Sequence, residues 1–199
     1  MILLILKYKS ILSGTQGRKS MLFKFTTAAR GESIVFGAER PGYPTKSVNE
    51  VLVQDWILFM KDKDIRRICC LLSTEQLDYY GEDLLAIYRQ EFGQEQVCWA
   101  PIEDYHLSDV HTLKRQILPF LAKSDANKER VVVHCSGGIG RTGHILAAWL
   151  VHGRQFEIKD ALSEVRRMGR NPFEAIQYGI ATQSQLYELL SDCREDSHQ

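Results

Sequence analysis

Several features that would assign a chain to a common class of protein are missing from this sequence. It has no basic excess, because 25 Lys and Arg residues balance 25 Asp and Glu residues, whereas nucleic-acid binders usually carry a basic excess or stripe. It has no run of about 20 apolar residues, which a membrane span needs. It also has no CxxC pair, a common mark of a zinc site. We therefore expect no nucleic-acid partner, no membrane partner and no metal.

Cysteine is sparse, and its spacing is not that of a disulfide framework. The number of cysteines is odd, which leaves at least one thiol unpaired in any scheme. We expect free thiols in a reducing cytosol, and hence a cytoplasmic protein, for Cys69, Cys70, Cys98, Cys135 and Cys193. The length of 199 residues fits one domain with a core of its own.

The first twenty residues differ in pattern from the rest of the chain. Residues 1–6 are almost wholly apolar, but a signal peptide places its basic residues before a longer apolar run, and here Lys7 and Lys9 follow it. Residues 10–20 are polar and contain two glycines, a composition typical of flexible segments. We predict a flexible N-terminal appendage over 1–20, a folded domain over 21–192 and a polar tail over 193–199.

Short apolar runs alternate with amphipathic segments along the folded part. Runs bounded by glycine, proline or charge predict strands, the first of them an edge strand or hairpin, over 34–36, 64–72, 97–102 and 130–133. Helical spacing of apolar residues predicts helices over 50–61, 80–92, 110–121, 140–151, 158–168, 173–178 and 183–190. This alternation predicts an α/β fold, a mainly parallel central sheet with helices on both faces. In such sheets ligands bind beyond the carboxyl ends of the strands.

One of those strand ends carries a distinctive loop. Cys135 ends the strand over 130–133, Arg141 begins the next helix, and three glycines lie between them. Glycines allow backbone N–H groups to wrap around an oxyanion, and a helix N-terminus adds donors and a positive dipole end. Arg141 can hold two phosphate oxygens, and positive surroundings favour the nucleophilic thiolate of Cys135. A glycine-rich turn with a buried cysteine is the alternative interpretation. We predict a phosphate-binding loop formed by Ser136, Gly137, Gly138, Ile139, Gly140 and Arg141.

Residues 134–143 read His-Cys-Ser-Gly-Gly-Ile-Gly-Arg-Thr-Gly, which resembles the signature of the protein tyrosine phosphatase superfamily. The small size of the chain makes it most similar to members of the dual-specificity branch. Residues 65–104 and 170–177 are most similar to the cyclin-dependent kinase inhibitor-associated phosphatases and their microbial relatives. The resemblance implies a cysteine phosphatase (dual-specificity phosphatase-like) fold and hydrolysis through a phosphocysteine intermediate, without cofactor. It makes Cys135 the nucleophile and Arg141 the phosphate ligand. Thr142 would donate to the sulfur, and His134 would orient the loop and support the thiolate.

Expelling the leaving oxygen needs a proton donor on a loop that reaches over the pocket. The loop after 97–102 is the candidate, and the resemblance implies that Asp104 is the general acid. Asp109 is the rival, although its place at a helix start is explained by capping. The loop lacks the proline that follows this aspartate in many relatives. In the same way, the resemblance gives Gln177 a part in positioning the attacking water, with an exposed helical glutamine as the alternative.

The substrate is less clearly marked in the sequence. The phosphate-binding loop contains no lysine, whereas relatives that act on phosphoinositides tend to have basic residues there, so a phosphorylated protein is favoured. The sequence has no clear counterpart of the loop that clamps phosphotyrosine in larger relatives. We therefore expect hydrolysis of phosphotyrosine and also of phosphoserine and phosphothreonine. We expect the protein to be a monomer. The alternatives are a catalytically silent phosphoprotein-binding module and an RNA 5′-triphosphatase. Arg40, in a loop rich in proline and glycine, is expected to be solvated.

Overall fold

The computed structural model describes residues 22–194 of the chain. The appendage predicted over 1–20 lies outside the described residues, as does most of the tail predicted over 193–199. Cys193, the first residue of that tail, is buried in the core, where its thiol donates to the carbonyl of Leu189. The packed part of the chain therefore includes Cys193.

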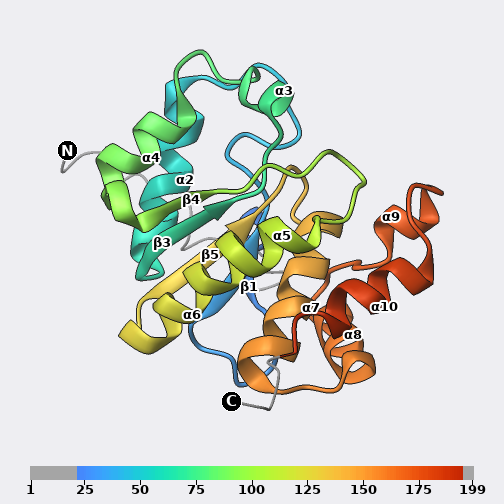
Figure 1. Ribbon diagram of the computed structural model, residues 1–199. Helices are drawn as coiled ribbons and strands as arrows, with labels where there is room; N and C mark the ends of the chain where they lie inside the picture. Colours follow the sequence, from blue (N-terminus) through green and yellow to red (C-terminus); the bar gives the residue numbers. More distant parts are fainter. Residues whose placement is uncertain (1–21, 195–199) are drawn as a thin grey trace, which may run out of the picture.

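A five-stranded sheet forms the centre of the molecule (Figure 1). Its strands are β1 (Thr26–Thr27), β2 (Val35–Ala38), β3 (Ile65–Cys70), β4 (Val97–Trp99) and β5 (Arg130–His134), in the order β1-β2-β5-β3-β4. Only the β1–β2 pair is antiparallel, and all the other pairs are parallel. The prediction of a mainly parallel sheet is confirmed. The first strand region is a hairpin, because β2 lies between β1 and β5 rather than at the edge.

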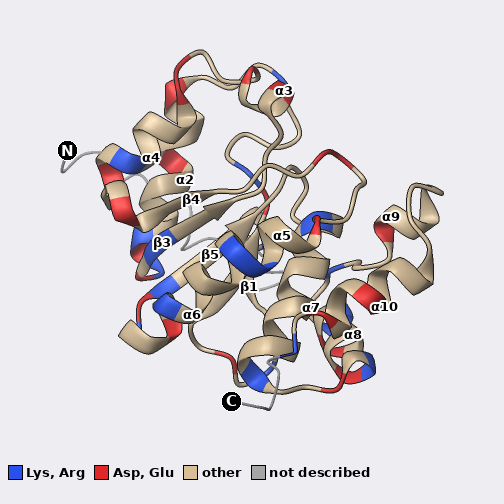
Figure 2. Ribbon diagram, viewed as in Figure 1, with Lys and Arg blue, Asp and Glu red and all other residues tan. Residues whose placement is uncertain are grey.

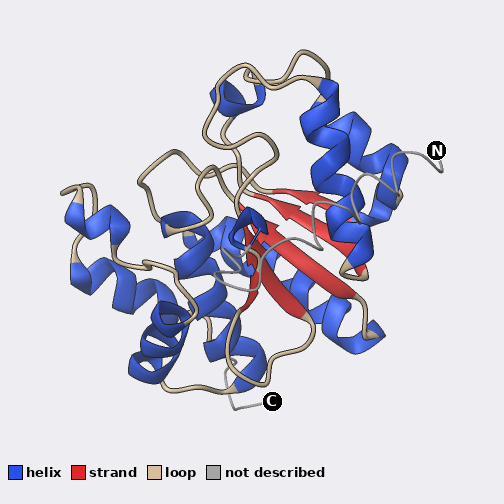
Figure 3. Ribbon diagram, turned by 180° about the vertical axis from the view of Figure 1, so that it is seen from behind, coloured by secondary structure: helices blue, strands red, loops and turns tan. Residues whose placement is uncertain are grey.

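Helices cover both faces of the sheet (Figures 1 and 3). Helices α2 (Glu50–Asp62) and α4 (Leu84–Phe92) pack on one face, and most of the remaining helices pack on the other. Alternate residues of β5 divide between the two cores, since Val131 and Val133 face one and Val132 faces the other. The remaining elements are η1 (Leu22–Lys24), α3 (Thr74–Leu77), η2 (Gln94–Gln96), α5 (Val110–Thr112), η3 (Leu113–Ile117), α6 (Leu118–Asn127), α7 (Gly140–Arg154), α8 (Ile158–Arg167), α9 (Glu174–Gln177) and α10 (Gln183–Ser191).

Capping explains where the predicted helices begin. Asn49 caps α2 by accepting a hydrogen bond from the N–H of Leu52, as its position predicts. The helix predicted from residue 80 begins instead at Leu84, because Asp83 accepts hydrogen bonds from two N–H groups of the first turn. The helix predicted over 110–121 continues to Asn127 through the π-helical turn η3, directly before Pro119 in α6. Proline cannot donate to the preceding turn and crowds it, which accounts for the irregular segment.

Lys and Arg, like Asp and Glu, are spread over many elements of the ribbon (Figure 2). One buried cluster nevertheless holds distant segments together. The carboxylate of Glu32 accepts hydrogen bonds from the N–H of Ile34 (2.8 Å), the indole of Trp149 (3.1 Å) and Nε of Arg154 (2.9 Å). Burial raises the pKa of Glu32, but these donors outweigh burial and leave the pKa below its usual value. The cluster joins the turn before β2 to the C-terminal end of α7.

Replacing this carboxylate should destabilise the protein at neutral pH. We expect Glu32→Gln to lower the free energy of unfolding by about 1–3 kcal/mol, because a neutral amide cannot replace the charged hydrogen bonds from Arg154, which keeps Asp125 as its other charged partner. Since the folded protein has the lower pKa, the stabilisation is present above the unfolded pKa of about 4.3 and is lost as pH falls through the folded pKa. Urea unfolding at pH 7 and below pH 4 would measure the difference.

The matched control for this variant is Glu157→Gln. Glu157 pairs with Arg194 at 2.6 Å, but its side chain is 73% exposed. An exposed pair contributes less than about 1 kcal/mol, so this variant should unfold nearly as the wild type does. Equal effects of the two substitutions at pH 7 would show that the Glu32 cluster does not stabilise the fold.

Candidate active site

Four loops meet at one edge of the sheet because the parallel strands β2, β3, β4 and β5 all end there. β5 lies between β2 and β3, so the loop that follows it at residues 135–139 has a neighbour on each side. The loop after β2 brings Arg40, the segment after β3 brings Gln76, and the loop after β4 brings Asp104. The carboxyl edge of the sheet therefore gathers the predicted site.

The loop after β5 holds its carbonyl groups outward. The carbonyl of Ser136 accepts from the N–H of Arg40 (3.0 Å), that of Gly137 from Nζ of Lys24 (3.2 Å), and that of Ile139 from the N–H of Asn171 (3.3 Å). The carbonyl of Gly138 accepts from the guanidinium of Arg170. In a trans peptide the next N–H points the opposite way, so the N–H groups of residues 137–140 face the inside of the loop. Such a ring of donors binds an anion.

Gly138 cannot be replaced by another residue without disturbing this loop. Its φ is +69°, and a Cβ at this position would lie 2.5 Å from the carbonyl oxygen of Ala38. The loop therefore packs directly on the end of β2, at a distance that only glycine allows.

Arg170 is the main tie between this loop and the rest of the fold. Besides Gly138, its guanidinium donates to the carbonyls of Gly37 (2.6 Å) and Lys24 (2.7 Å) and to the hydroxyl of Thr26 (2.9 Å). Arg170 is only 4% exposed, and burial lowers its pKa to about 10, so it remains charged at neutral pH. A single buried cation thus positions the loop against β1 and β2.

Cys135 lies at the base of the loop and is 2% exposed. The neighbouring His134 is wholly buried, which lowers its pKa to about 3 and keeps its ring neutral at neutral pH. Its Nε2 lies 3.2 Å from the hydroxyl of Tyr88 and its Nδ1 lies 3.3 Å from the carbonyl of Cys135. A ring that accepts from Tyr88 and donates from Nδ1 satisfies both contacts. His134 can therefore orient the backbone at Cys135, but it places no positive charge there.

Arg141 and Asp104 form an ion pair at 2.8 Å between Nη2 and Oδ1. The guanidinium of Arg141 also donates to the side chain of Gln76 and the carbonyl of Ile102, each at 2.8 Å. Gln76 in turn donates to the other oxygen of Asp104 at 3.2 Å. The side chain of Arg141 is 1% exposed and that of Asp104 is 45% exposed. The predicted phosphate ligand and the predicted acid therefore lie side by side, with Asp104 toward solvent.

Asp109, the rival to Asp104, is occupied as a helix cap. Its carboxylate accepts from the N–H of Thr112 at 2.8 Å, and this hydrogen bond lowers the pKa of Asp109. The N–H of Ser108 donates to Nε2 of His144, a neutral buried ring on α7. These contacts fix the far end of the loop, while Asp104 remains at the site.

Thr142 and Gln177, two of the predicted site residues, do not make the contacts that were predicted for them. The hydroxyl of Thr142 is buried and has no hydrogen-bond partner among the described residues, so the expected donation to the sulfur is not formed here. Gln177 is exposed, and its side-chain oxygen accepts from the amide of Asn171 at 2.7 Å. The roles of both residues stay predictions.

The sequence suggested that Arg40 is solvated, but the residue is buried, with 1% exposure. Its Nε donates to the hydroxyl of Ser136 at 3.2 Å, and its other nitrogens donate to backbone carbonyls of its own loop. The sequence also did not reveal Gln76, Lys24, Arg170 or Glu174 as parts of the site. The available signal was the position of Gln76 after a strand end and of Arg170 and Glu174 in the segment that resembles relatives, whereas Lys24, before β1, had none.

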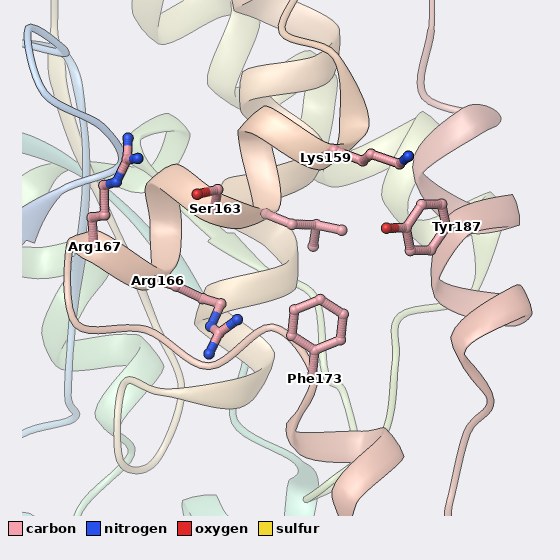
Figure 4. Close-up of a pocket in the computed structure, with 7 residues that line it drawn as sticks. Lys159, Ser163, Arg166, Arg167, Phe173 and Tyr187 are labelled. Atoms are coloured by element: carbon pink, nitrogen blue, oxygen red, sulfur yellow. The ribbon is translucent and has the colours of Figure 1, made fainter.

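The surface has one hollow beside the loop that follows β5 and another away from it. One of about 450 Å³ is lined by Phe23, Tyr43, Pro44 and Leu52, and the ring of Tyr43 packs near Gly137. Another of about 430 Å³ lies between α8 and α10, where Lys159 lies beside Tyr187 and Arg166 beside Phe173 (Figure 4). None of the residues 134–142 lines the second hollow, so it is separate from the site.

Within residues 22–194, no group of three or more His, Cys, Asp or Glu side chains is placed to hold a metal ion. No helix in the described part of the chain is long and apolar enough to cross a membrane.

A cysteine at the base of a loop whose N–H groups converge, with an arginine at the start of the following helix, is the arrangement that a cysteine nucleophile needs to attack a bound phosphate ester. Residues 57–191 match the family described as "Dual specificity phosphatase, catalytic domain". The chain belongs to this family.

The chain is also similar to individual proteins. The chain is 43% identical over 119 residues to an uncharacterised protein, MJECL20, of Methanocaldococcus jannaschii, covering 60% of this chain and 69% of that protein. It is 29% identical over 90 residues to human dual specificity protein phosphatase 5, covering 45% of this chain but only 23% of that protein's length. The crystal structure of a kinase associated phosphatase, 21% identical, superposes with a TM-score of 0.61 over 77% of this chain and 87% of that one, which supports the fold.

Weakening the tie at Arg170 should impair anion binding. We expect Arg170→Lys to reduce the affinity for tungstate, a tetrahedral oxyanion, by at least about tenfold, because an ammonium cannot donate to all the segments that the guanidinium joins. Isothermal titration calorimetry would measure the affinity. Arg166→Lys, at an exposed position of α8, is the control and should bind tungstate as the wild type does. Unchanged binding in Arg170→Lys would show that the loop keeps its shape without this contact.

Proposed function

We propose that the protein hydrolyses phosphate esters on phosphorylated proteins through a phosphocysteine intermediate. The observation that carries this proposal is the outward anchoring of the carbonyls of residues 136–139, which turns the following N–H groups toward the inside of the loop that begins at Cys135. A phosphoryl group held by these donors and by Arg141 would lie within reach of the sulfur. Membership of the dual specificity phosphatase family supports this reaction.

In the first step the Cys135 thiolate attacks phosphorus, and the bond between phosphorus and the ester oxygen breaks. Arg141 and the N–H groups of the loop stabilise the negative charge on the phosphoryl oxygens. Asp104, which is partly exposed at the edge of the site, gives its proton to the leaving oxygen. Phosphate must displace Asp104 from part of its contact with Arg141, which frees the carboxyl group for this task.

In the second step water attacks the phosphocysteine, the phosphorus–sulfur bond breaks, and the thiolate leaves. The Asp104 carboxylate takes one proton from the water, and inorganic phosphate is released. The carboxyl group thus alternates between acid and base. No cofactor is needed in either step, since nucleophile, phosphate ligand and proton carrier all come from this chain.

Substrate choice within phosphoproteins is proposed from the surroundings of the loop. Tyr43 and the apolar hollow beside Gly137 offer a surface for the residues that flank the phosphorylated one. Lys24 lies 4.5 Å from the centroid of the Tyr43 ring, so a cation borders the same surface. We propose that phosphotyrosine is accepted and that phosphoserine and phosphothreonine are accepted as well, in line with the dual specificity family.

The nucleophile can be tested with small aryl phosphates. Wild-type protein should hydrolyse p-nitrophenyl phosphate in the presence of EDTA, and Cys135→Ser should reduce the rate by a factor on the order of 10³ or more, because a serine hydroxyl stays protonated. Trapping of a radiolabelled phosphoenzyme after acid quench would identify the intermediate. A requirement for added metal, or survival of activity in Cys135→Ser, would exclude the proposed chemistry.

The general acid can be tested with two substrates of different leaving-group strength. Asp104→Asn should lower kcat by about 10²-fold or more for phenyl phosphate, and by less for p-nitrophenyl phosphate, whose leaving group needs a proton less. Asp109→Asn is the matched control, because asparagine caps a helix as well as aspartate does, and kcat should change by less than about threefold. The opposite pattern would assign the acid to Asp109.

A further inference from the structure

Glu174 is a carboxylate at the rim of the phosphate-binding loop to which the proposed mechanism gives no task. It begins α9, directly after the segment that carries Arg170 and Asn171. Its side chain lies against Gly140, where a Cβ would be 2.6 Å from Cδ of Glu174 and would clash with its Oε2. Glycine at 140 is therefore required for the carboxylate to lie where it does.

The surroundings of Glu174 are those of a group inside the site. It is partly buried, and burial raises its pKa, with the negative charge of Asp104 acting in the same direction. Arg141 and the N–H of Gly140 act in the opposite direction by stabilising the carboxylate. The N–H of Gly140 is one of those that face the inside of the loop. Glu174 thus reaches the rim of the anion site and shares Arg141 with Asp104.

The loop that carries Asp104 and the segment that carries Glu174 are packed together. The rings of Tyr105 and Tyr178 lie 4.1 Å apart between centroids, at an interplanar angle of 32°. The loop after β4 and the chain around α10 also share a hollow, with His106, Leu107 and Ser108 on one side and Ile180 and Gln185 on the other. The positions of the two carboxylates relative to each other are therefore set by contacts outside the anion site.

Gln177, to which the resemblance assigns the attacking water, makes its hydrogen bond to Asn171 and not to the loop. It is exposed and hydrogen-bonded to Asn171, three residues beyond Glu174 on the same short helix. The polar side chain of α9 that contacts the loop is that of Glu174.

We propose that Glu174 holds the water molecule that hydrolyses the phosphocysteine. This inference rests on the proposed function, since it concerns the second step of that reaction. Once the phosphoryl group of the intermediate has taken the N–H groups of the loop, the Glu174 carboxylate accepts a hydrogen bond from the water. The water's other proton goes to Asp104, its oxygen forms the new bond to phosphorus, and the bond to sulfur breaks. The products are the Cys135 thiolate, protonated Asp104 and hydrogen phosphate.

Burst kinetics separate this role from a merely structural one. In rapid-quench experiments with excess p-nitrophenyl phosphate, Glu174→Ala should release about one equivalent of p-nitrophenol per enzyme at nearly the wild-type rate. It should then turn over at least about tenfold more slowly, because only the second step has lost its water ligand. Glu174→Gln keeps an oxygen acceptor at the same reach and should slow turnover by less than about threefold. Glu174→Asp shortens the side chain by one methylene and should give a burst like that of Glu174→Ala.

The controls make each outcome decisive. Glu188→Ala removes an exposed glutamate of α10 and should leave both phases unchanged. Loss of the first phase together with the second in all three Glu174 variants would show a structural role and overturn the inference. A burst in Gln177→Ala, with none in Glu174→Ala, would assign the water to Gln177 and overturn it as well. Absence of turnover by the wild type would overturn the proposed function itself, which distinguishes that failure from failure at Glu174.

Discussion

The direction of the carbonyl groups in residues 136–139 is the constraint on which the rest of the site depends. A strand followed by a helix could be joined by many turns, but only one that directs its carbonyls outward can gather N–H groups around an anion. Each outward carbonyl needs a donor, because a buried carbonyl without one is costly. The donors are the backbone N–H groups of Arg40 and Asn171 and the side chains of Lys24 and Arg170, and this explains why the guanidinium of Arg170 is buried beside the loop.

Carboxylates lie close to the buried arginine of the loop. Arg141 is almost fully buried and would be destabilising without a partner, since burial of an unpaired charge is costly. Asp104 and the oxygens of Gln76 and Ile102 supply its partners within the described chain. Glu174 adds a second carboxylate at the rim. In the proposed reaction, phosphate takes over part of the contact that Asp104 makes with Arg141.

The parts of the site that follow one another in the sequence could be predicted, and the parts that meet through the fold could not. The loop from Cys135 to Arg141 is contiguous, and its glycines and strand-to-helix position carry its chemistry. The family match confirms the class that this signature predicted. Asp104 could be placed only by resemblance, because its contact with Arg141 joins residues 37 apart.

The burial of individual side chains was harder to predict from the sequence. Arg40 lies in a loop of prolines and glycines, which usually indicates exposure, but its side chain is buried by a contact with Ser136 across 96 residues and by hydrogen bonds to carbonyls of its own loop. Glu174 and Gln177 share one short helix, and a four-residue helix has too little periodicity to show which of them faces the site. The irregular segment at η3 likewise followed from Pro119, whose effect on the preceding turn was not anticipated.

The wide sequence separation of the loop's anchors links catalysis to the completion of folding. Lys24 reaches Gly137 across 113 residues, and Arg170 joins Gly138 to Gly37 across a span of 133 residues. Contacts between residues so far apart in the sequence form only after most of the chain has been brought together. A partly folded or locally opened molecule therefore has the signature residues but no organised anion site. Phosphatase activity in this protein would report the cooperative native state, and its reactive cysteine would gain its catalytic surroundings only there.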